Sequence, residues 1–152
     1  TYRKFQSQGI LSADRDHWYN VFSPPPDAIW EEAWDYTEQA ILDFKSISEK
    51  YGATFTLVLV ADSLQIYHEN HPMKGKDFTY PNSRIMKFCS DNEIYCLDSL
   101  TYFTSYKKIN NLTYPYFSWK SDGHYSSLGH RVMFDFLIKS GLSDRLTSNN
   151  ND

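Results

Sequence analysis

The segment Ser121–His130 contains the residue types of an acid–base relay. Asp122 and His124 are separated by one glycine, and a backbone turn at Gly123 would bring the Asp122 carboxylate to Nδ1 of His124. A carboxylate in that place fixes the tautomer of the ring and leaves Nε2 to act as a general base. We therefore predict that Asp122 and His124 are catalytic residues and supply two members of a Ser-His-Asp triad.

A serine that such a base could activate occurs at Ser63, in the sequence Ala61-Asp62-Ser63-Leu64. A serine at a strand-to-helix turn can attack a carbonyl, with backbone N–H groups as the oxyanion hole. Three features count against Ser63. Ala61 replaces the glycine that permits a tight turn, residues 65–72 show no helical pattern, and the chain from Ser63 to His124 is too short for the strands of a full sheet. Ser63 is therefore only an alternative nucleophile.

Further histidines leave a metal site open as another alternative. Asp122, His124 and His130 could together hold a metal ion that assists hydrolysis, and His68 and His71 have the spacing of a ligand pair. However, His130 falls inside a predicted helix, where a packing role is the simpler interpretation. The His68 pair has no cysteine partner and does not match H-E-x-x-H. The sequence therefore predicts neither a metal nor another cofactor.

The composition excludes several classes of partner. The chain has 152 residues, a formal net charge of -4 and 15 scattered basic residues, which is unlike the basic stripe of a nucleic-acid binder. No apolar run approaches the roughly 20 residues of a membrane span. The chain also begins without an initiator methionine or a signal-like segment. These features predict an excised or mature piece of a longer protein that binds no nucleic acid and contains no membrane span.

Aromatic residues and cysteines each have two interpretations. Aromatics make up 17% of the chain, which suits a packed core with half-buried tyrosines and also a surface that stacks on sugars. Cys89 and Cys96 could form a bridge between a helix end and the following strand in an oxidising compartment. Two free buried thiols are the simpler prediction.

Apolar periodicity predicts one long helix and two buried strands. The helix covers Ala28–Lys50, with Asp27 as its N-cap and Gly52 just past its end. The apolar, β-branched segments Thr54–Ala61 and Ile94–Leu100 are typical of strands in a parallel sheet. Shorter helices are predicted from Pro81 through Phe88, over Tyr102–Ile109, and from Ser126 or Ser127 to Gly141. The segments 62–80 and Tyr114–Lys120 are predicted as loops.

This alternation of helices and strands predicts an α/β fold with a layered sheet. Only two strands are convincing, whereas a stable parallel sheet normally has more, so the C-terminal part of such a domain fits better than a whole one. Residues 1–26, which end in three prolines, are predicted as an extended lead-in. The domain would then cover residues 27–141, and residues 142–152 would be a polar tail.

In this order of motifs the chain resembles the C-terminal part of SGNH (GDSL-type) hydrolases over roughly residues 20–141. It is most similar to bacterial members in which a long helix rich in Trp and Glu precedes the penultimate strand. The segments that carry the resemblance are Pro26–Glu38, Leu57–Val60, Tyr80–Arg84, Ile94–Asp98, Asp122–Tyr125 and Gly129–Arg131.

The resemblance implies a flavodoxin-like three-layer α/β/α fold with a parallel sheet. It favours a secreted or periplasmic location, although the sequence itself leaves the location unknown. It implies hydrolysis or transfer of acyl esters of small molecules or carbohydrates, often acetyl esters, with His124 as the base and Asp122 as its orienter. Tyr125 departs from the tryptophan that is common after this histidine. The family's Gly-Asp-Ser block has no counterpart here, so the nucleophile is expected upstream of Thr1. The alternative is a non-catalytic module that binds glycan or protein through Tyr114–Trp119.

Overall fold

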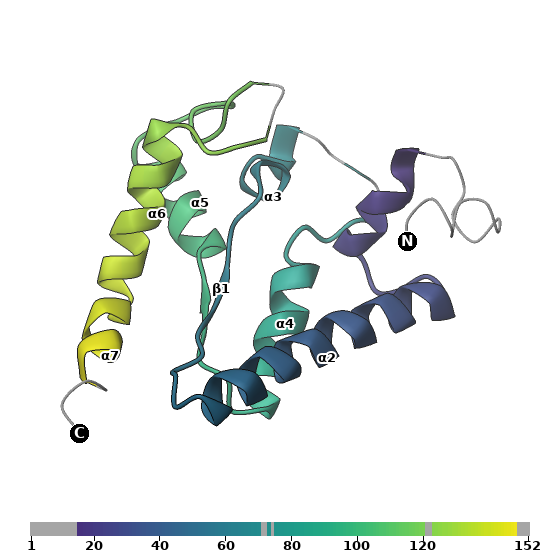
Figure 1. The fold of residues 1–152 in the computed structure, drawn as a ribbon. Coiled ribbons are helices and arrows are strands. Elements are labelled where there is room, and N and C mark those ends of the chain that lie inside the picture. Colours follow the sequence, from purple (N-terminus) through teal and green to yellow (C-terminus); the bar gives the residue numbers. More distant parts are fainter. Residues whose placement is uncertain (1–14, 71–72, 74, 121–122, 149–152) are drawn as a thin grey trace.

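The computed structural model describes residues 15–70, 73, 75–120 and 123–148. Helices and strands alternate along the chain (Figure 1), so the prediction of an α/β protein is confirmed at that level. The elements are η1 (Arg15–Phe22), α2 (Ala28–Lys50), β1 (Leu57–Leu59), α3 (Ser63–Ile66), η2 (His68–Asn70), α4 (Tyr80–Asp91), β2 (Cys96–Asp98), α5 (Leu100–Ile109), α6 (Ser127–Lys139) and α7 (Leu142–Ser148).

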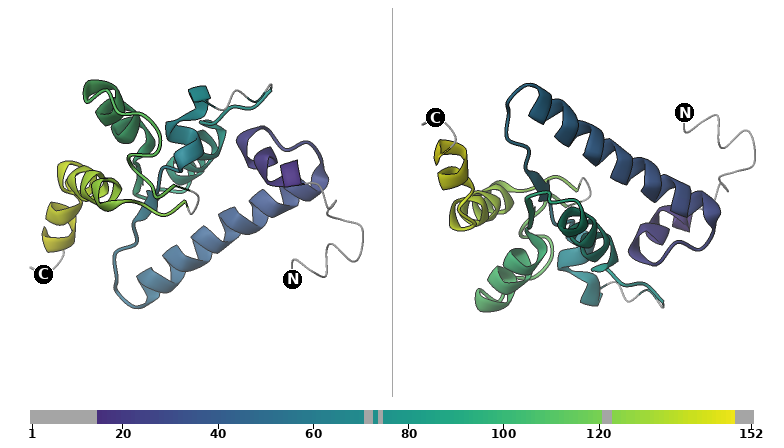
Figure 2. Two further views of the ribbon diagram at one scale, coloured as in Figure 1. Left: turned by 90° about the horizontal axis from the view of Figure 1, so that it is seen from above. Right: turned by 90° about the horizontal axis from the view of Figure 1, so that it is seen from below.

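β1 and β2 pair in parallel and form the only sheet among the described residues. Both lie inside the predicted segments Thr54–Ala61 and Ile94–Leu100, which confirms the two strands and their direction. Each strand is only three residues long. Figure 2 shows α2 and α6 on opposite sides of the two strands.

Just beyond the three paired residues, a side-chain hydroxyl takes over the hydrogen bonding between the carboxyl ends of the two strands. The Ser99 hydroxyl donates to the carbonyl of Leu59 and accepts from the N–H of Ala61, both at 2.9 Å. Ser99 is completely buried, and a buried hydroxyl needs such partners. Ser99 therefore fixes the path of the chain as it leaves β1.

The longest helix, α2, has the predicted bounds because local signals define both ends. The Asp27 carboxylate accepts from the N–H groups of Ile29 and Trp30, both at 3.1 Å. At the other end Gly52 adopts a φ of 68°, and its N–H donates to the carbonyl of Glu49 at 3.0 Å. Such end signals are readable from sequence. The predicted helices α4, α5 and α6 are also present.

The predicted extended lead-in over residues 1–26 is wrong for Arg15–Phe22, which form the 3₁₀ helix η1. Phe22 is buried, and its ring lies 4.8 Å from the ring of Phe78. The N–H of Asp77 donates to the carbonyl of Phe22 at 2.7 Å. A short 3₁₀ helix with one aromatic anchor leaves no periodic pattern in the sequence.

The predicted loop over residues 62–80 is wrong at α3 and η2. α3 begins with a capping box: the Asp62 carboxylate accepts from the N–H of Leu64 at 2.7 Å, and the Gln65 side chain accepts from the N–H of Asp62 at 3.0 Å. This reciprocal pair stabilises one helical turn without any apolar repeat. A helix does follow Ser63, which removes one of the three arguments against that serine.

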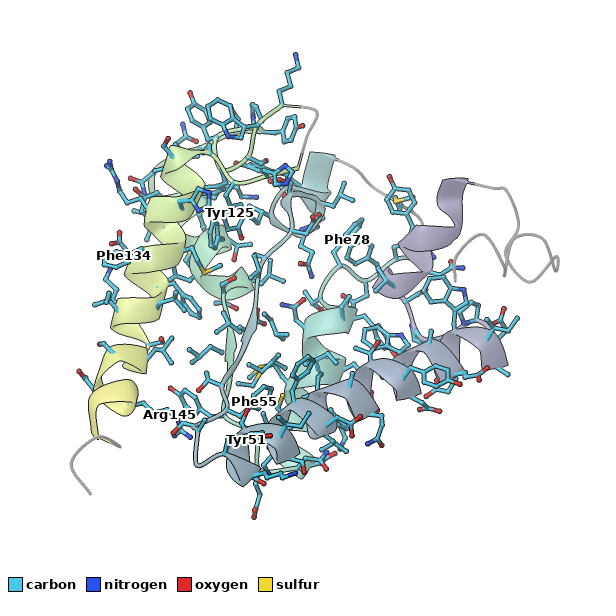
Figure 3. The ribbon with its side chains drawn as sticks, viewed as in Figure 1. Tyr51, Phe55, Phe78, Tyr125, Phe134 and Arg145 are labelled. Atoms are coloured by element: carbon cyan, nitrogen blue, oxygen red, sulfur yellow. The ribbon has the colours of Figure 1, made fainter. Side chains whose placement is uncertain are left out.

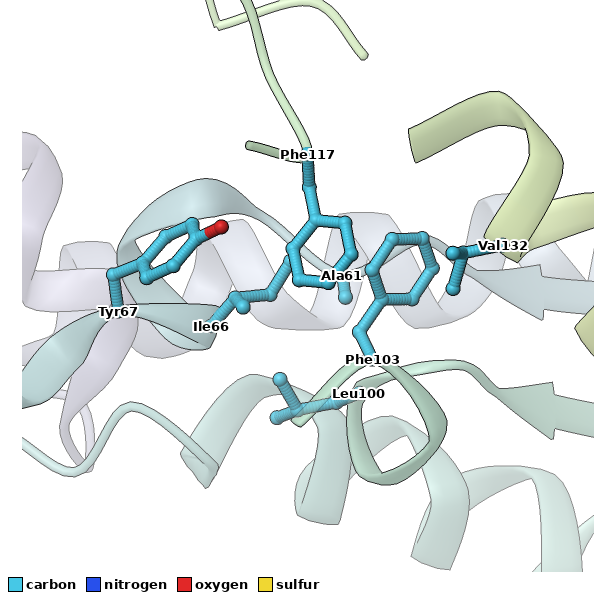
Figure 4. Close-up of a cluster of buried hydrophobic side chains, with 7 residues drawn as sticks. All are labelled: Ala61, Ile66, Tyr67, Leu100, Phe103, Phe117 and Val132. Atoms are coloured by element: carbon cyan, nitrogen blue, oxygen red, sulfur yellow. The ribbon is translucent and has the colours of Figure 1, made fainter. Parts of the chain in front are cut away.

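Two hydrophobic clusters hold the helices against the strands. The first joins α3, α5, α6 and the loop before α6, and Figure 4 shows its seven buried side chains, Ala61, Ile66, Tyr67, Leu100, Phe103, Phe117 and Val132. The second joins α2 and α4 and contains Trp34, Ile85, Cys89 and Ile94. Partly buried Leu57 and Leu59 of β1 pack against this second cluster.

The two cysteines and the C-terminal segment complete the fold. Cys89 and Cys96 are free thiols, as predicted. The polar tail predicted over residues 142–152 begins with a further helix, α7, which the sequence did not predict. Arg145 of α7 lies over the ring of Tyr95 at 4.2 Å from its centroid.

Candidate functional site

His124 is exposed in the loop between α5 and α6. Gly123 before it has a φ of 76°, a left-handed conformation that glycine adopts without steric cost. This φ is compatible with the predicted backbone turn at Gly123, which also involves residues outside the described ranges and so stays a prediction. Asp122 lies outside the described residues, so its contact with His124 stays a prediction.

The loop that carries His124 is held as a narrow hairpin. Ser118 and Tyr125 form an isolated antiparallel bridge. Next to it, the N–H of Trp119 donates to the carbonyl of His124 at 2.8 Å. These contacts fix the backbone of His124 although its side chain is exposed.

A close approach between this hairpin and α6 requires Gly129. A Cβ atom at this position would lie 2.1 Å from the carbonyl oxygen of Phe117 and 3.0 Å from Cβ of Tyr125. The N-cap of α6 is Ser126, whose hydroxyl accepts from the N–H of Gly129 at 3.2 Å, as predicted for Ser126 or Ser127. The sequence Ser126–Gly129 thus joins the hairpin directly to the helix.

Tyr125 connects the His124 loop to the end of β1. Figure 3 labels the Tyr125 side chain near the upper end of β1. Its hydroxyl donates to the carbonyl of Ala61 at 2.6 Å, and its ring lies 5.1 Å from the ring of Phe103. Burial and the nearby Asp62 carboxylate raise the pKa of Tyr125, so this hydroxyl stays a donor at neutral pH. Tyr125 therefore brings His124 to the carboxyl end of the sheet.

The result is an open pocket of about 300 Å³ at the carboxyl end of β1. Binding sites of parallel α/β sheets lie at this end. The pocket contains two imidazoles and one carboxylate from segments far apart in the sequence. Its lining residues are Val60, Ala61, Asp62, Gly123, His124, Tyr125 and His130.

Buried polar side chains support the wall of this pocket from behind. Asn82 donates to the Asp98 carboxylate at 2.6 Å, and Gln65 donates to the side-chain oxygen of Asn82 at 2.6 Å. Gln65 also accepts from Asp62, so the network ends at the pocket. None of these contacts was predicted from the sequence. The D-x-x-Q spacing of Asp62 and Gln65 could have revealed the cap, whereas nothing local indicates the contact between Asn82 and Asp98.

Ser63 is the first residue of α3, and its hydroxyl is hydrogen-bonded to that of Ser118. Its neighbours Ala61 and Asp62 line the His124 pocket, but Ser63 does not. Within the described part of the chain, no serine lines that pocket. The structure thus brings the Ser63 segment to the His124 loop without directing the serine hydroxyl into the pocket.

The other histidines occupy different places. The ring of His130 faces that of Tyr125 edge-on, with 5.9 Å between centroids, and His130 lines the pocket. His68 lies on η2, where its Nδ1 donates to the carbonyl of Gln65 at 2.9 Å. His71 lies outside the described residues.

No group of three or more histidine, cysteine, aspartate or glutamate side chains that could hold a metal ion occurs in residues 15–70, 73, 75–120 and 123–148. The set of Asp122, His124 and His130 is not tested, because Asp122 is not described. Among the described helices, none is both long and apolar enough to cross a bilayer.

Comparisons of this chain with protein-family models, with curated proteins and with solved structures found no match. The resemblance to SGNH hydrolases therefore remains an inference from the sequence motifs.

Proposed function

We propose that this chain carries the relay half, His124 and Asp122, of an SGNH-type serine esterase with a flavodoxin-like fold. The nucleophilic serine would come from sequence outside these 152 residues. The substrate would be an acyl ester of a small molecule or a carbohydrate, and the acyl group would pass to water or to a second hydroxyl. No cofactor is required for this chemistry.

The pocket at the carboxyl end of β1 is the observation that supports this proposal. It exposes His124 beside the small side chain of Ala61, and a volume of about 300 Å³ leaves room for a short acyl group. The hairpin and Tyr125 hold His124 in place from two directions. A general base must be positioned before it is useful, since geometry decides proton transfer first.

The mechanism follows from these positions. The serine oxygen would attack the ester carbonyl while Nε2 of His124 takes the hydroxyl proton. The tetrahedral intermediate would then collapse, and His124 would return the proton to the departing alkoxide. A water molecule, activated by the same imidazole, would release the acid in a second cycle. Asp122 would orient the ring and stabilise the imidazolium that forms in each cycle.

Hydrolysis of p-nitrophenyl acetate by the intact protein tests this proposal. His124→Ala is expected to lower kcat/KM by about a thousandfold or more, because a triad without its base retains only residual catalysis. His68→Ala is the matched control, since His68 is also exposed but does not line the pocket, and its activity should match that of the wild type. Equal activity of His124→Ala and wild type would refute the role of His124.

A non-catalytic glycan-binding module is the second candidate, and one observation favours it. Tyr116 and Trp119 expose 55% and 58% of their surface on the segment that leads to His124. Exposed aromatic rings of this kind can stack on sugar rings. This function predicts saccharide binding that weakens in Trp119→Ala, together with no ester hydrolysis by the intact protein.

A further inference from the structure

Helix α2 carries a long apolar stripe on its exposed side, which we call the outer stripe. Its members are apolar or aromatic residues at helical spacing, namely Ile29, Ala33, Tyr36, Ala40, Phe44, Ile47 and the C-cap residue Tyr51. The five large members expose between 45% and 78% of their surface, and the two alanines are also exposed. A contiguous apolar surface of this length marks a place of contact with another molecule.

The outer stripe points away from the rest of the fold. On the inner side of α2, buried Trp34 and partly buried Ile41 and Leu42 pack in the second hydrophobic cluster. Figure 2 shows α2 at one border of the molecule, with the sheet and the other helices on its inner side. Among the described elements none covers the outer stripe, so a partner for it must come from outside them.

The outer stripe has the same spacing when it is followed from either end, with Ala40 at its centre. Its other members form pairs at equal distances from Ala40 along the chain, which are Tyr36 with Phe44, Ala33 with Ile47, and Ile29 with Tyr51. If two copies of α2 lie antiparallel about a two-fold axis at Ala40, the members of each pair face each other across the contact. Large side chains would then meet in two kinds of pair, and in the third Ile47 would meet the small Ala33.

Polar side chains along one flank of the outer stripe complement each other in this arrangement. The flank consists of four exposed residues at helical spacing, which are Glu32, Gln39, Asp43 and Lys50. Within one copy, the Gln39 amide already donates to the Asp43 carboxylate at 2.9 Å. About an axis at Ala40, Glu32 would face Lys50 of the second copy and Gln39 would face Asp43, and each pair would occur twice. Opposite charges at such positions set the orientation of paired helices.

An apolar pocket borders the outer stripe on its other flank. Its volume is about 260 Å³, and Ala33 lines it together with Trp34 and with Val21 of η1. Ile47 of the second copy would lie opposite Ala33 and therefore beside this pocket. Side chains that enter well-packed pockets contribute most of the binding energy at protein interfaces. The pocket thus provides a specific place for Ile47.

From these observations we infer that the outer stripe binds the outer stripe of a second copy of this chain, with the two α2 helices antiparallel. Each copy has five large side chains that are 45–78% exposed, so the pair would bury roughly 1,200 Å² in total if a complete aromatic side chain contributes about 200 Å². This area is at the lower limit of specific interfaces. We therefore expect a reversible dimer with a dissociation constant in the micromolar range. Self-association of this kind is independent of the proposed esterase activity.

Sedimentation equilibrium of the intact protein, at concentrations from about 1 to 500 μM, tests the dimer. The average mass of the wild type should rise toward twice the mass of the monomer. Phe44→Asp should stay monomeric over the same range, because it places a charge in the apolar contact. Phe134→Asp on α6 is the matched control, since Phe134 is 62% exposed, and it should associate like the wild type. A monomeric wild type, or equal association of the two variants, would overturn the inference.

Charge reversal tests the antiparallel orientation. Glu32→Lys would place a positive charge opposite Lys50 of the second copy, and Lys50→Glu would place a negative charge opposite Glu32. Each single change should raise the dissociation constant of the dimer about tenfold or more at low salt. The double variant restores a pair of opposite charges and should return the constant to within about threefold of the wild-type value. No effect of the single changes, or no recovery in the double variant, would overturn the antiparallel arrangement.

Discussion

At the scale of single residues, Gly129 allows the His124 hairpin to rest on α6. Gly129→Ala would place a methyl group 2.1 Å from a backbone oxygen, which only a backbone shift can relieve. We expect a loss of about 1–3 kcal/mol in the free energy of unfolding, measured by urea denaturation. Ser127→Ala, an exposed change on the same helix, should stay within about 0.5 kcal/mol of the wild type. Equal stability of both variants would contradict the close approach.

Tyr125 joins the two halves of the pocket through one hydroxyl. Tyr125→Phe removes the donor to the carbonyl of Ala61, a residue that is only 1% exposed. Leaving a buried carbonyl unpaired should cost about 1–3 kcal/mol in unfolding experiments. Tyr116→Phe, on an exposed ring, is the matched control and should be neutral. A neutral Tyr125→Phe would mean that this hydrogen bond does not hold the loop.

Only some of the pocket residues could be predicted from the sequence. The Asp122-Gly123-His124 motif could be recognised because its members are adjacent, and Gly123 has a left-handed φ of 76°. Asp62 was visible only as the neighbour of Ser63, because its place beside His124 depends on a contact between distant segments. No sequence pattern indicated that the Ser99 hydroxyl fixes the end of β1, because its hydrogen-bond partners belong to another strand.

At the scale of elements, Arg84 fastens α4 to α2. Its guanidinium binds Glu38 at 2.7 Å and Glu31 at 2.9 Å and lies over the ring of Trp34. Arg84→Met should lower stability by about 2 kcal/mol, because Glu38 would stay half-buried without its partner. Lys87→Met, which breaks an exposed pair within α4, should cost less than about 1 kcal/mol in the same denaturation experiment.

The ion pair also predicts a pH dependence. Hydrogen bonding by Arg84 lowers the pKa of Glu31 below 4.5. A lowered pKa in the folded state stabilises the protein above the unfolded value, and this stabilisation is lost as the pH falls through the folded value. As the pH falls below about 4.5, the free energies of unfolding of the wild type and of Arg84→Met should therefore become more similar. A difference that stays constant down to pH 2 would contradict this.

The thiol at the start of β2 should be inert. Burial, with the neighbouring Cys89, raises the pKa of Cys96 from 9.0 to about 12. Because the thiolate is the reactive species, alkylation by iodoacetamide at pH 8 should be about a thousandfold slower than in the unfolded chain. The raised pKa stabilises the fold below pH 9, and this contribution is lost as the pH rises toward 12. Rapid alkylation of the native protein would contradict the buried environment.

At the scale of the whole molecule, the helices were more predictable than the sheet. α2 has the expected bounds because its caps and its apolar periodicity are local in the sequence. η1 and α7 were not predicted, because contacts with distant parts of the chain stabilise them. The two strands were found, but the ladder is shorter than their apolar segments. Within the described residues the sheet keeps only these two parallel strands.

Labelling of the intact polypeptide with a fluorophosphonate, followed by peptide mapping, tests the central claim most directly. The reagent bonds covalently to a serine that a general base has activated. We predict one labelled serine outside these 152 residues, and loss of the label in His124→Ala but not in His68→Ala. Label on Ser63, or label that persists in His124→Ala, would contradict the account of His124 as the base of a serine esterase.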